Sequence, residues 1–97
     1  MIRFRRAESD DLAAVKKIAR RFALDTEDMQ ADQFMLAIHD DKIVGFGRLK
    51  KHPDILELGS LGVVKERRGS GVGKMIVEEI LERAENDVYI TTVIPDF

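Results

Sequence analysis

The feature that most constrains this fold is a glycine-rich run that joins an apolar stretch to an amphipathic one. The run reads Arg68-Gly69-Ser70-Gly71-Val72-Gly73-Lys74, between apolar residues at 61–64 and a helical pattern at 75–85. Alternate glycines let a backbone pass close to a ligand and turn its N–H groups toward one point, and a following helix adds the positive end of its dipole. The run therefore predicts a strand, an anion-binding turn and a helix, in that order.

Two well-known phosphate-binding motifs do not fit this run. The loop of nucleoside triphosphatases needs a glycine five positions before its Gly-Lys pair and Ser or Thr after it, where this chain has Arg68 and Met75. A dinucleotide fingerprint that began at Gly69 would need its third glycine where Lys74 stands. The run does fit a pattern of Gln or Arg, two residues, Gly, one residue, and Gly or Ala, from Arg68 through Gly71 to Gly73.

With its flanks, the run resembles the acetyl-coenzyme A loop of the GNAT superfamily of N-acetyltransferases. The likeness extends over residues 57–78, and the hairpin-like residues 43–47 add to it. It implies an α/β fold of the α+β type, with a mixed, mainly antiparallel sheet in the order strand, helix, optional second helix, three strands, helix and strand. Residues 1–97 then form a single N-acetyltransferase domain, shortened at its C-terminus because the last helix and two strands of the superfamily are missing.

Composition sets the class of protein. A length of 97 residues suits one small domain with a modest core, and the absence of cysteine excludes a disulfide framework, a thiolate metal site and a cysteine nucleophile. The net charge of −2 gives no general case for nucleic-acid binding, and no apolar run has the length of a membrane span or a secretory segment. We therefore expect a cytoplasmic domain that binds neither nucleic acid nor membrane.

Periodicity predicts the elements before the run. Alternating apolar and basic residues predict a strand at 2–6, and Ser9 is expected to cap a helix. The inner stripe of that helix consists of Leu12, Val15, Ile18 or Ala19, and Phe22. The next predicted elements are a short helix within 24–33, strands at 34–38 and 43–49, and turns at 39–42 and 51–54. The resemblance implies that residues 24–33 help to line the groove for the acceptor.

The strand before the run changes its apolar face partway along. Its apolar residues are Leu56 and Leu58, then Leu61 and Val63, which have opposite parity. Because side chains alternate along a strand, one extra residue near Gly59-Ser60 would restore a common face. Such a β-bulge frees backbone groups for a cofactor between splayed strands. A strand buried on both faces would need no bulge. We favour the bulge, since Gly59 and Gly62 are poor strand formers.

After the run, one helical face gathers apolar side chains that should pack on the sheet. These are Val72, Ile76, Val77, Ile80, Leu81 and Ala84. Residues 88–92 are then expected to form a fifth strand, parallel to the fourth because a right-handed helical crossover connects them.

A full member of the superfamily continues beyond this point with another helix, often bearing a tyrosine that acts as general acid. Tyr89 is the chain's one tyrosine, and its place within a strand indicates packing instead. The ending at residue 97 allows three interpretations: a fragment, a minimal member of the superfamily, or an assembly whose partner covers the last strand. Since an unpaired edge favours pairing, we expect a homodimer through residues 88–92.

The resemblance implies acetyl transfer from acetyl-CoA to an amine. The residues that match the pyrophosphate loop are Arg68, Gly69, Ser70, Gly71, Val72, Gly73 and Lys74, and those that match the strand along the pantetheine arm are Leu61, Gly62 and Val63. Both groups are expected to act largely through their backbone. Among the basic side chains of this region, Arg68 is the one expected to add charge toward phosphate.

Glu57 is the candidate catalytic residue. It lies eleven residues before Arg68, where histone-type members of the superfamily have a glutamate that removes the amine proton through water. The alternatives are an ordinary surface glutamate and a mechanism that uses ordered water alone. His39 and His52 fall in predicted turns and are interpreted as exposed residues, not proton shuttles, and no metal-binding cluster is visible.

The sequence offers less about the acceptor. Residues 89–97 resemble the segment of N-acetylglutamate synthase-type enzymes in which a Thr-Thr pair precedes an aromatic residue. The resemblance favours an amino acid or small amine, with a protein lysine or N-terminal amine as the alternative because of Glu57. A module that binds acetyl-CoA without turning it over, or a mere interaction module, is a further alternative.

Overall fold

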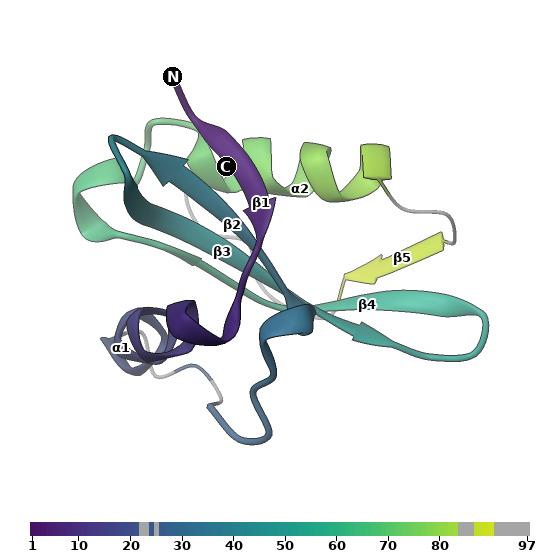
Figure 1. The fold of residues 1–97 in the computed structure, drawn as a ribbon. Coiled ribbons are helices and arrows are strands. Elements are labelled where there is room, and N and C mark those ends of the chain that lie inside the picture. Colours follow the sequence, from purple (N-terminus) through teal and green to yellow (C-terminus); the bar gives the residue numbers. More distant parts are fainter. Residues whose placement is uncertain (22–23, 25, 84–86, 91–97) are drawn as a thin grey trace.

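Five strands form one mixed sheet with a helix on each face in the computed structural model, which describes residues 1–21, 24, 26–83 and 87–90 (Figure 1). The strands are β1 (Arg3–Arg6), β2 (Phe34–His39), β3 (Lys42–Lys51), β4 (Ile55–Val63) and β5 (Asp87–Ile90), and the helices are α1 (Leu12–Arg21) and α2 (Val72–Arg83). The order of the strands in the sheet follows the order in the chain. The first four pair antiparallel, whereas β5 runs parallel to β4 after α2. The predicted fold class is confirmed.

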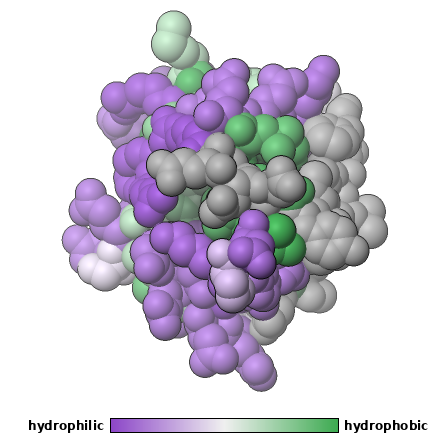
Figure 2. Space-filling view, turned by 90° about the vertical axis from the view of Figure 1, so that its right-hand side faces the viewer, coloured by the Kyte–Doolittle hydropathy of each residue, from purple (hydrophilic) through white to green (hydrophobic). Residues whose placement is uncertain are grey.

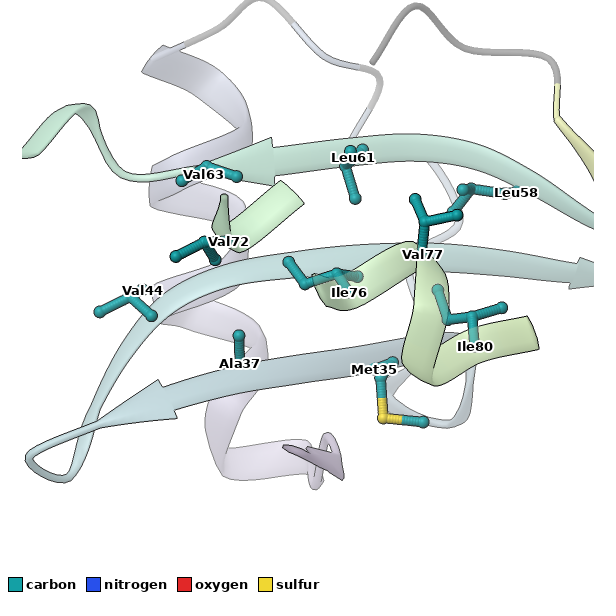
Figure 3. Packing of buried hydrophobic residues seen from close by; sticks show 10 residues of the cluster. All are labelled: Met35, Ala37, Val44, Leu58, Leu61, Val63, Val72, Ile76, Val77 and Ile80. Atoms are coloured by element: carbon teal, nitrogen blue, oxygen red, sulfur yellow. The ribbon is translucent and has the colours of Figure 1, made fainter. Parts of the chain in front are cut away.

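Each face of the sheet carries its own apolar core. On one face α1 packs through its buried residues Val15, Ile18 and Ala19 against Phe34, Leu36, Ile38 and Phe46. On the other face α2 packs onto the central strands, and Figure 3 shows its Val72, Ile76, Val77 and Ile80 over Met35, Ala37, Leu58, Leu61 and Val63. The predicted stripes are thus confirmed for the described residues except Leu81, which is 52% exposed because it lies at the margin of the apolar face of α2. Phe22 and Ala84 lie outside the described residues.

The entry to α1 differs from the prediction that Ser9 caps it. Ser9 is the first residue of a 3-10 turn (Ser9–Asp11), and Glu8 is its N-cap. Asp11 completes a capping box, since its Oδ2 accepts a hydrogen bond of 2.7 Å from the Glu8 backbone N–H. Arg5 donates to both carboxylate oxygens of Asp11, and these hydrogen bonds hold the pKa of Asp11 below its ordinary value while raising that of Arg5.

The β2–β3 hairpin closes through a tight turn with a bulge beside it. Asp40 and Asp41 both have positive φ, 50° and 61°, the conformation of a type I′ turn. His39 is the last residue of β2, not a turn residue as predicted. The β2–β3 register shifts between Ala37 and Ile38 of β2, which leaves Val44 of β3 as an extra residue that the sequence did not predict.

The predicted second helix is wrong for the described residues. Between α1 and β2 they contain a single 3-10 turn (Ala31–Gln33), and residue 25 of the predicted region 24–33 lies outside the description. Arg48, a buried residue of β3, holds this segment: its Nε donates to Gln33 Oε1 at 3.0 Å and its Nη2 to the Glu27 carbonyl at 2.7 Å. The side chain of Arg48, which is distant in the sequence, therefore holds the described part of this segment, where the prediction had the backbone hydrogen bonds of a helix.

The bulge predicted in the fourth strand is present. Arg48 pairs with Ser60 and Leu49 with Leu58, so Gly59 is the extra residue. Leu58 and Leu61 consequently both face the core under α2 (Figure 3). Pairing with β5 runs from Ile55 to Leu58 and ends directly before the bulge, as far as the described part of β5 extends.

No helix in the described part of the chain combines the length and apolar character needed to cross a membrane.

Candidate functional site

The glycine turn (residues 68–71) lies between a 3-10 turn (Lys65–Arg67) and the first residue of α2. Gly69 and Gly71 have φ of 77° and 86°, a conformation that other residues adopt at a cost. A Cβ built on either glycine would meet nothing within 4 Å. These glycines are therefore required by the backbone conformation, and space for an approaching ligand lies beside them.

The beginning of α2 supplies hydrogen-bond donors at this turn. The helical ladder starts with the Met75 N–H, which donates to the Gly71 carbonyl at 3.0 Å. The N–H groups of Val72, Gly73 and Lys74 precede it and have no acceptor within the helix. The helix begins at Val72 and not at Met75 as the sequence pattern suggested, so the last residues of the run belong to its first turn. Such a terminus favours an anion.

Basic side chains surround the turn. Arg68 and Lys74 are exposed, and Lys74 Nζ lies 3.8 Å from Glu78 Oε1 in a surface ion pair. Ser70 donates its hydroxyl hydrogen to the Arg67 carbonyl, which ties the turn to the residues before it. The backbone therefore defines the turn, while the basic side chains add positive charge near it.

Leu61, Gly62 and Val63 reach the same end of the sheet from β4. The side chains of Leu61 and Val63 are buried under α2, and Gly62 faces the ring of Phe46. Their antiparallel partners on β3 are Gly47, Phe46 and Gly45. In the described residues no strand pairs with the outer edge of β4 (residues 59–63), the edge that faces away from β3. Because the side chains of Leu61 and Val63 are buried, it is the backbone of this edge that faces outward, and its contact with a cofactor stays a prediction.

Glu57 lies farther along β4, on the other side of the bulge. Its side chain is about a quarter exposed, and Oε1 lies 2.8 Å from His52 Nε2. It precedes Leu58, which faces α2, so Glu57 is on the face that carries α1. From Glu57 to Val63 the strand advances by roughly 20 Å, so a ligand that contacts both Glu57 and the glycine turn must be long and extended.

The sequence missed the link between Glu57 and His52. His52 does lie in the predicted turn and is about half exposed, yet its ring contacts the candidate catalytic residue. A spacing of five residues across a hairpin turn could have indicated the pair.

The surface near the predicted residues is shallow. A cleft of about 430 Å³ along α2 is lined by Lys74, Val77, Glu78 and Leu81. A second cleft of about 390 Å³, between α1 and the β2–β3 turn, is lined by none of the predicted residues. The face in Figure 2 is largely hydrophilic in its described part, with small apolar groups near its middle. Within the described ranges no group of three His, Asp or Glu side chains could hold a metal ion.

Comparison with known proteins agrees with this architecture. A family model described as "Acetyltransferase (GNAT) family" matches residues 3–96, whereas a search of curated proteins finds no match. Among solved structures, N-acetylglutamate synthase from Neisseria gonorrhoeae, complexed with coenzyme A and L-arginine, is similar with a TM-score of 0.76 and 21% identity, over 84% of this chain and 21% of that chain.

Two further solved structures share the fold. Diaminobutyrate acetyltransferase from Paenibacillus lautus has a TM-score of 0.71 and 23% identity, over 84% of this chain and 57% of that chain. Ribosomal-protein-alanine N-acetyltransferase from Brucella melitensis biovar Abortus 2308 has a TM-score of 0.80 and 14% identity, over 96% of this chain and 81% of that chain. This chain thus spans less than two thirds of the first two proteins. With the family model matching nearly its whole length, the chain belongs to the GNAT acetyltransferase family.

Proposed function

We propose that this chain transfers an acetyl group from acetyl-CoA to a primary amine. The observation that carries the proposal is the glycine turn: two glycines with left-handed φ and open space beside them stand at the first N–H groups of α2. Such donors suit the diphosphate of coenzyme A. The family match over residues 3–96 supports this assignment.

In this proposal the backbone binds acetyl-CoA along one line. Within residues 68–74 the backbone donates N–H groups to the diphosphate, except at Arg68 and Ser70, whose N–H groups already donate to the carbonyls of Lys65 and Arg67. Arg68 adds positive charge through its side chain. Leu61, Gly62 and Val63 offer the outer edge of β4 to the pantetheine arm, whose amide groups can pair with a strand. The roughly 20 Å between Glu57 and the end of β4 suits this extended molecule.

Glu57 acts as the general base. An ammonium group has no lone pair for attack, so a proton must leave it before its nitrogen bonds to the thioester carbonyl carbon. Glu57 accepts that proton through a water molecule. As the N–C bond forms and the C–S bond breaks, the nitrogen loses a second proton, the departing thiolate of coenzyme A takes up one proton, and an amide is formed.

An amino acid or small amine is the proposed acceptor. The names of two structural relatives support it, since one is an N-acetylglutamate synthase and the other is a diaminobutyrate acetyltransferase whose substrate is L-2,4-diaminobutyric acid. A protein amine is the alternative, supported by the ribosomal-protein-alanine enzymes with the same fold. A module that binds acetyl-CoA without transferring its acetyl group is the third candidate. For each of these functions the cytoplasm is the proposed compartment.

Calorimetry and a thiol-release assay test these candidates on the full chain. Calorimetry with coenzyme A should give saturable binding. Thiol release from acetyl-CoA should then depend on the acceptor, with L-glutamate, L-2,4-diaminobutyrate and an alanine-starting peptide as probes. Binding without acceptor-dependent release would favour the non-catalytic module, and no binding would overturn the proposal.

We also propose self-association through the outer edge of β5, the last strand of the sheet. Residues 91 and 92 of the predicted contact lie outside the described residues. Sedimentation at rising protein concentration should give a growing mass, and a constant monomer mass would contradict a homodimer.

A further inference from the structure

The β3–β4 hairpin places an imidazole directly on the carboxylate of Glu57. His52 is the first residue after β3, and its backbone N–H donates to the Ile55 carbonyl at 3.0 Å, which closes the hairpin. From this fixed backbone the ring reaches across to β4, and Nε2 lies 2.8 Å from Glu57 Oε1. The distance is that of a direct hydrogen bond.

The chemistry of the pair fixes which atom donates. An ionised carboxylate only accepts hydrogen bonds, so the proton of this bond resides on Nε2 of His52. The bond restrains Oε1 and thereby turns the other oxygen toward the bulge. A Cβ built on Gly59 would lie 3.8 Å from Glu57 Oε2, which places that oxygen beside the residue at which β4 leaves its described pairing with β5.

A competing cation lies on the neighbouring strand. Lys50 is the cross-strand partner of Glu57, and its Cε would be 3.9 Å from the same Cβ position at Gly59. Lys51 and Asp54 are exposed at the end of the hairpin, and Arg48 of β3 is buried. A carboxylate that lost the hydrogen bond from His52 would turn more readily toward Lys50, because the ammonium attracts it.

We propose that His52 is a positioning residue that holds Glu57 in the orientation needed for proton removal. This inference rests on the proposed role of Glu57 as general base. The bond restrains Oε1 and thereby limits the rotation of the whole carboxylate. A partly exposed pair of this kind contributes little to the free energy of folding. We therefore expect loss of the His52 ring to lower kcat and to leave stability unchanged.

The test compares His52→Phe, which removes the donor, with His52→Gln, whose amide can donate from a similar position. His39→Phe is the matched control, because His39 lies at the far end of β2 and outside the proposed catalytic machinery. Each full-length variant is assayed for kcat and KM with acetyl-CoA and the acceptor that supports wild-type release. We expect about a tenfold loss of kcat in His52→Phe, the equivalent of one hydrogen bond to a charged group, with unchanged KM for acetyl-CoA.

Rescue by His52→Gln to within about threefold of wild type would identify donation as the function of His52. Nitrogen NMR supplies a readout that does not need turnover: neutral His52 should show the Nε2–H tautomer, and Glu57→Gln should weaken that preference. If His52→Phe and wild type had equal kcat while Glu57→Gln had a reduced one, the positioning role of His52 would be overturned and the proposed role of Glu57 would stand. If Glu57→Gln also retained full kcat, the proposed general base would fail, and His52 with it.

Discussion

Gly62 of β4 lies against the edge of the Phe46 ring on β3: a Cβ built on Gly62 would be 2.6 Å from Cε2 and 2.9 Å from Cζ of that ring. Phe46 is fully buried and packs edge-on against Phe34, with 5.6 Å between ring centroids. The ring therefore has little room to move. Gly62 has a packing requirement of its own, separate from the proposed contact of its backbone with coenzyme A.

Gly62→Ala should consequently destabilise the protein. We expect the free energy of unfolding to fall by about 2 kcal/mol, the cost of overpacking a core. Urea denaturation measures it, and Gly59→Ala is the control on the same strand, because its Cβ would make only ordinary contacts at 3.8 Å or more. Equal free energies of unfolding for Gly62→Ala and Gly59→Ala would contradict this prediction, because they would show that the Phe46 ring moves aside at little cost.

Gly71→Val should act on coenzyme A binding more than on folding. A valine with φ near 86° is strained, yet its side chain would project into open space, so the stability cost should be only about 1–2 kcal/mol. A changed turn moves several N–H groups away from the diphosphate, and we expect affinity to fall about tenfold to a hundredfold. Calorimetry with coenzyme A checks this, with Glu66→Val as an exposed control in the preceding turn. Unchanged affinity would contradict diphosphate binding at this turn.

Asp11→Asn should destabilise the protein at neutral pH and much less in acid. The carboxylate caps the turn at Glu8 and accepts two hydrogen bonds from Arg5, which together lower its pKa in the folded state. A lowered folded pKa contributes stability that is complete above the unfolded value and disappears as the pH falls through the folded one. We expect a loss of about 1 kcal/mol at neutral pH.

Urea unfolding across a pH series measures this difference, with Asp10→Asn as the control in the same 3-10 turn. The gap between wild type and Asp11→Asn should narrow as the pH drops below the ordinary range of aspartate. If the difference in free energy of unfolding between wild type and Asp11→Asn stayed constant with pH, the charge of the Asp11 carboxylate would not be its cause.

Arg48→Met should loosen the segment before β2. Arg48 is 2% exposed as a residue. Its guanidinium donates hydrogen bonds to Gln33 and to the Glu27 carbonyl and lies 5.8 Å from the centre of the Phe34 ring. Methionine keeps much of the volume but none of the donors, so we expect a loss of about 2 kcal/mol. Limited proteolysis should cut faster at residues 26–33. Lys51→Met, at the exposed end of the same strand, should change neither quantity.

Short-range patterns explain what could be predicted from the sequence. The parity change between Leu58 and Leu61 predicted the bulge at Gly59, because only one arrangement lets both side chains face α2. The bulge at Val44 left no such signal. Ile43 and Val44 are both apolar and contact opposite cores, so either register looks the same in the sequence.

Long-range contacts explain what could not. The segment before β2 is held by Arg48, which lies 15 residues from Gln33 and 21 from Glu27, a pairing that no local pattern encodes. Likewise, Ser9 and Glu8 are both plausible caps, and the choice depends on Asp11, which is itself oriented by Arg5 from the neighbouring strand. The predicted contacts of residues 61–63 and 68–74 with coenzyme A stay predictions.

Gly59 is dispensable for the hydrophobic cores. Were it deleted, Leu58 and Ser60 would become neighbours, and inward and outward side chains would alternate along β4 without interruption, each still opposite its present partner on β3. A straighter strand would satisfy packing equally well. Packing alone therefore does not require the extra residue at the position where the described pairing with β5 ends. A variant that lacks Gly59 would separate the requirements of folding from those of ligand binding.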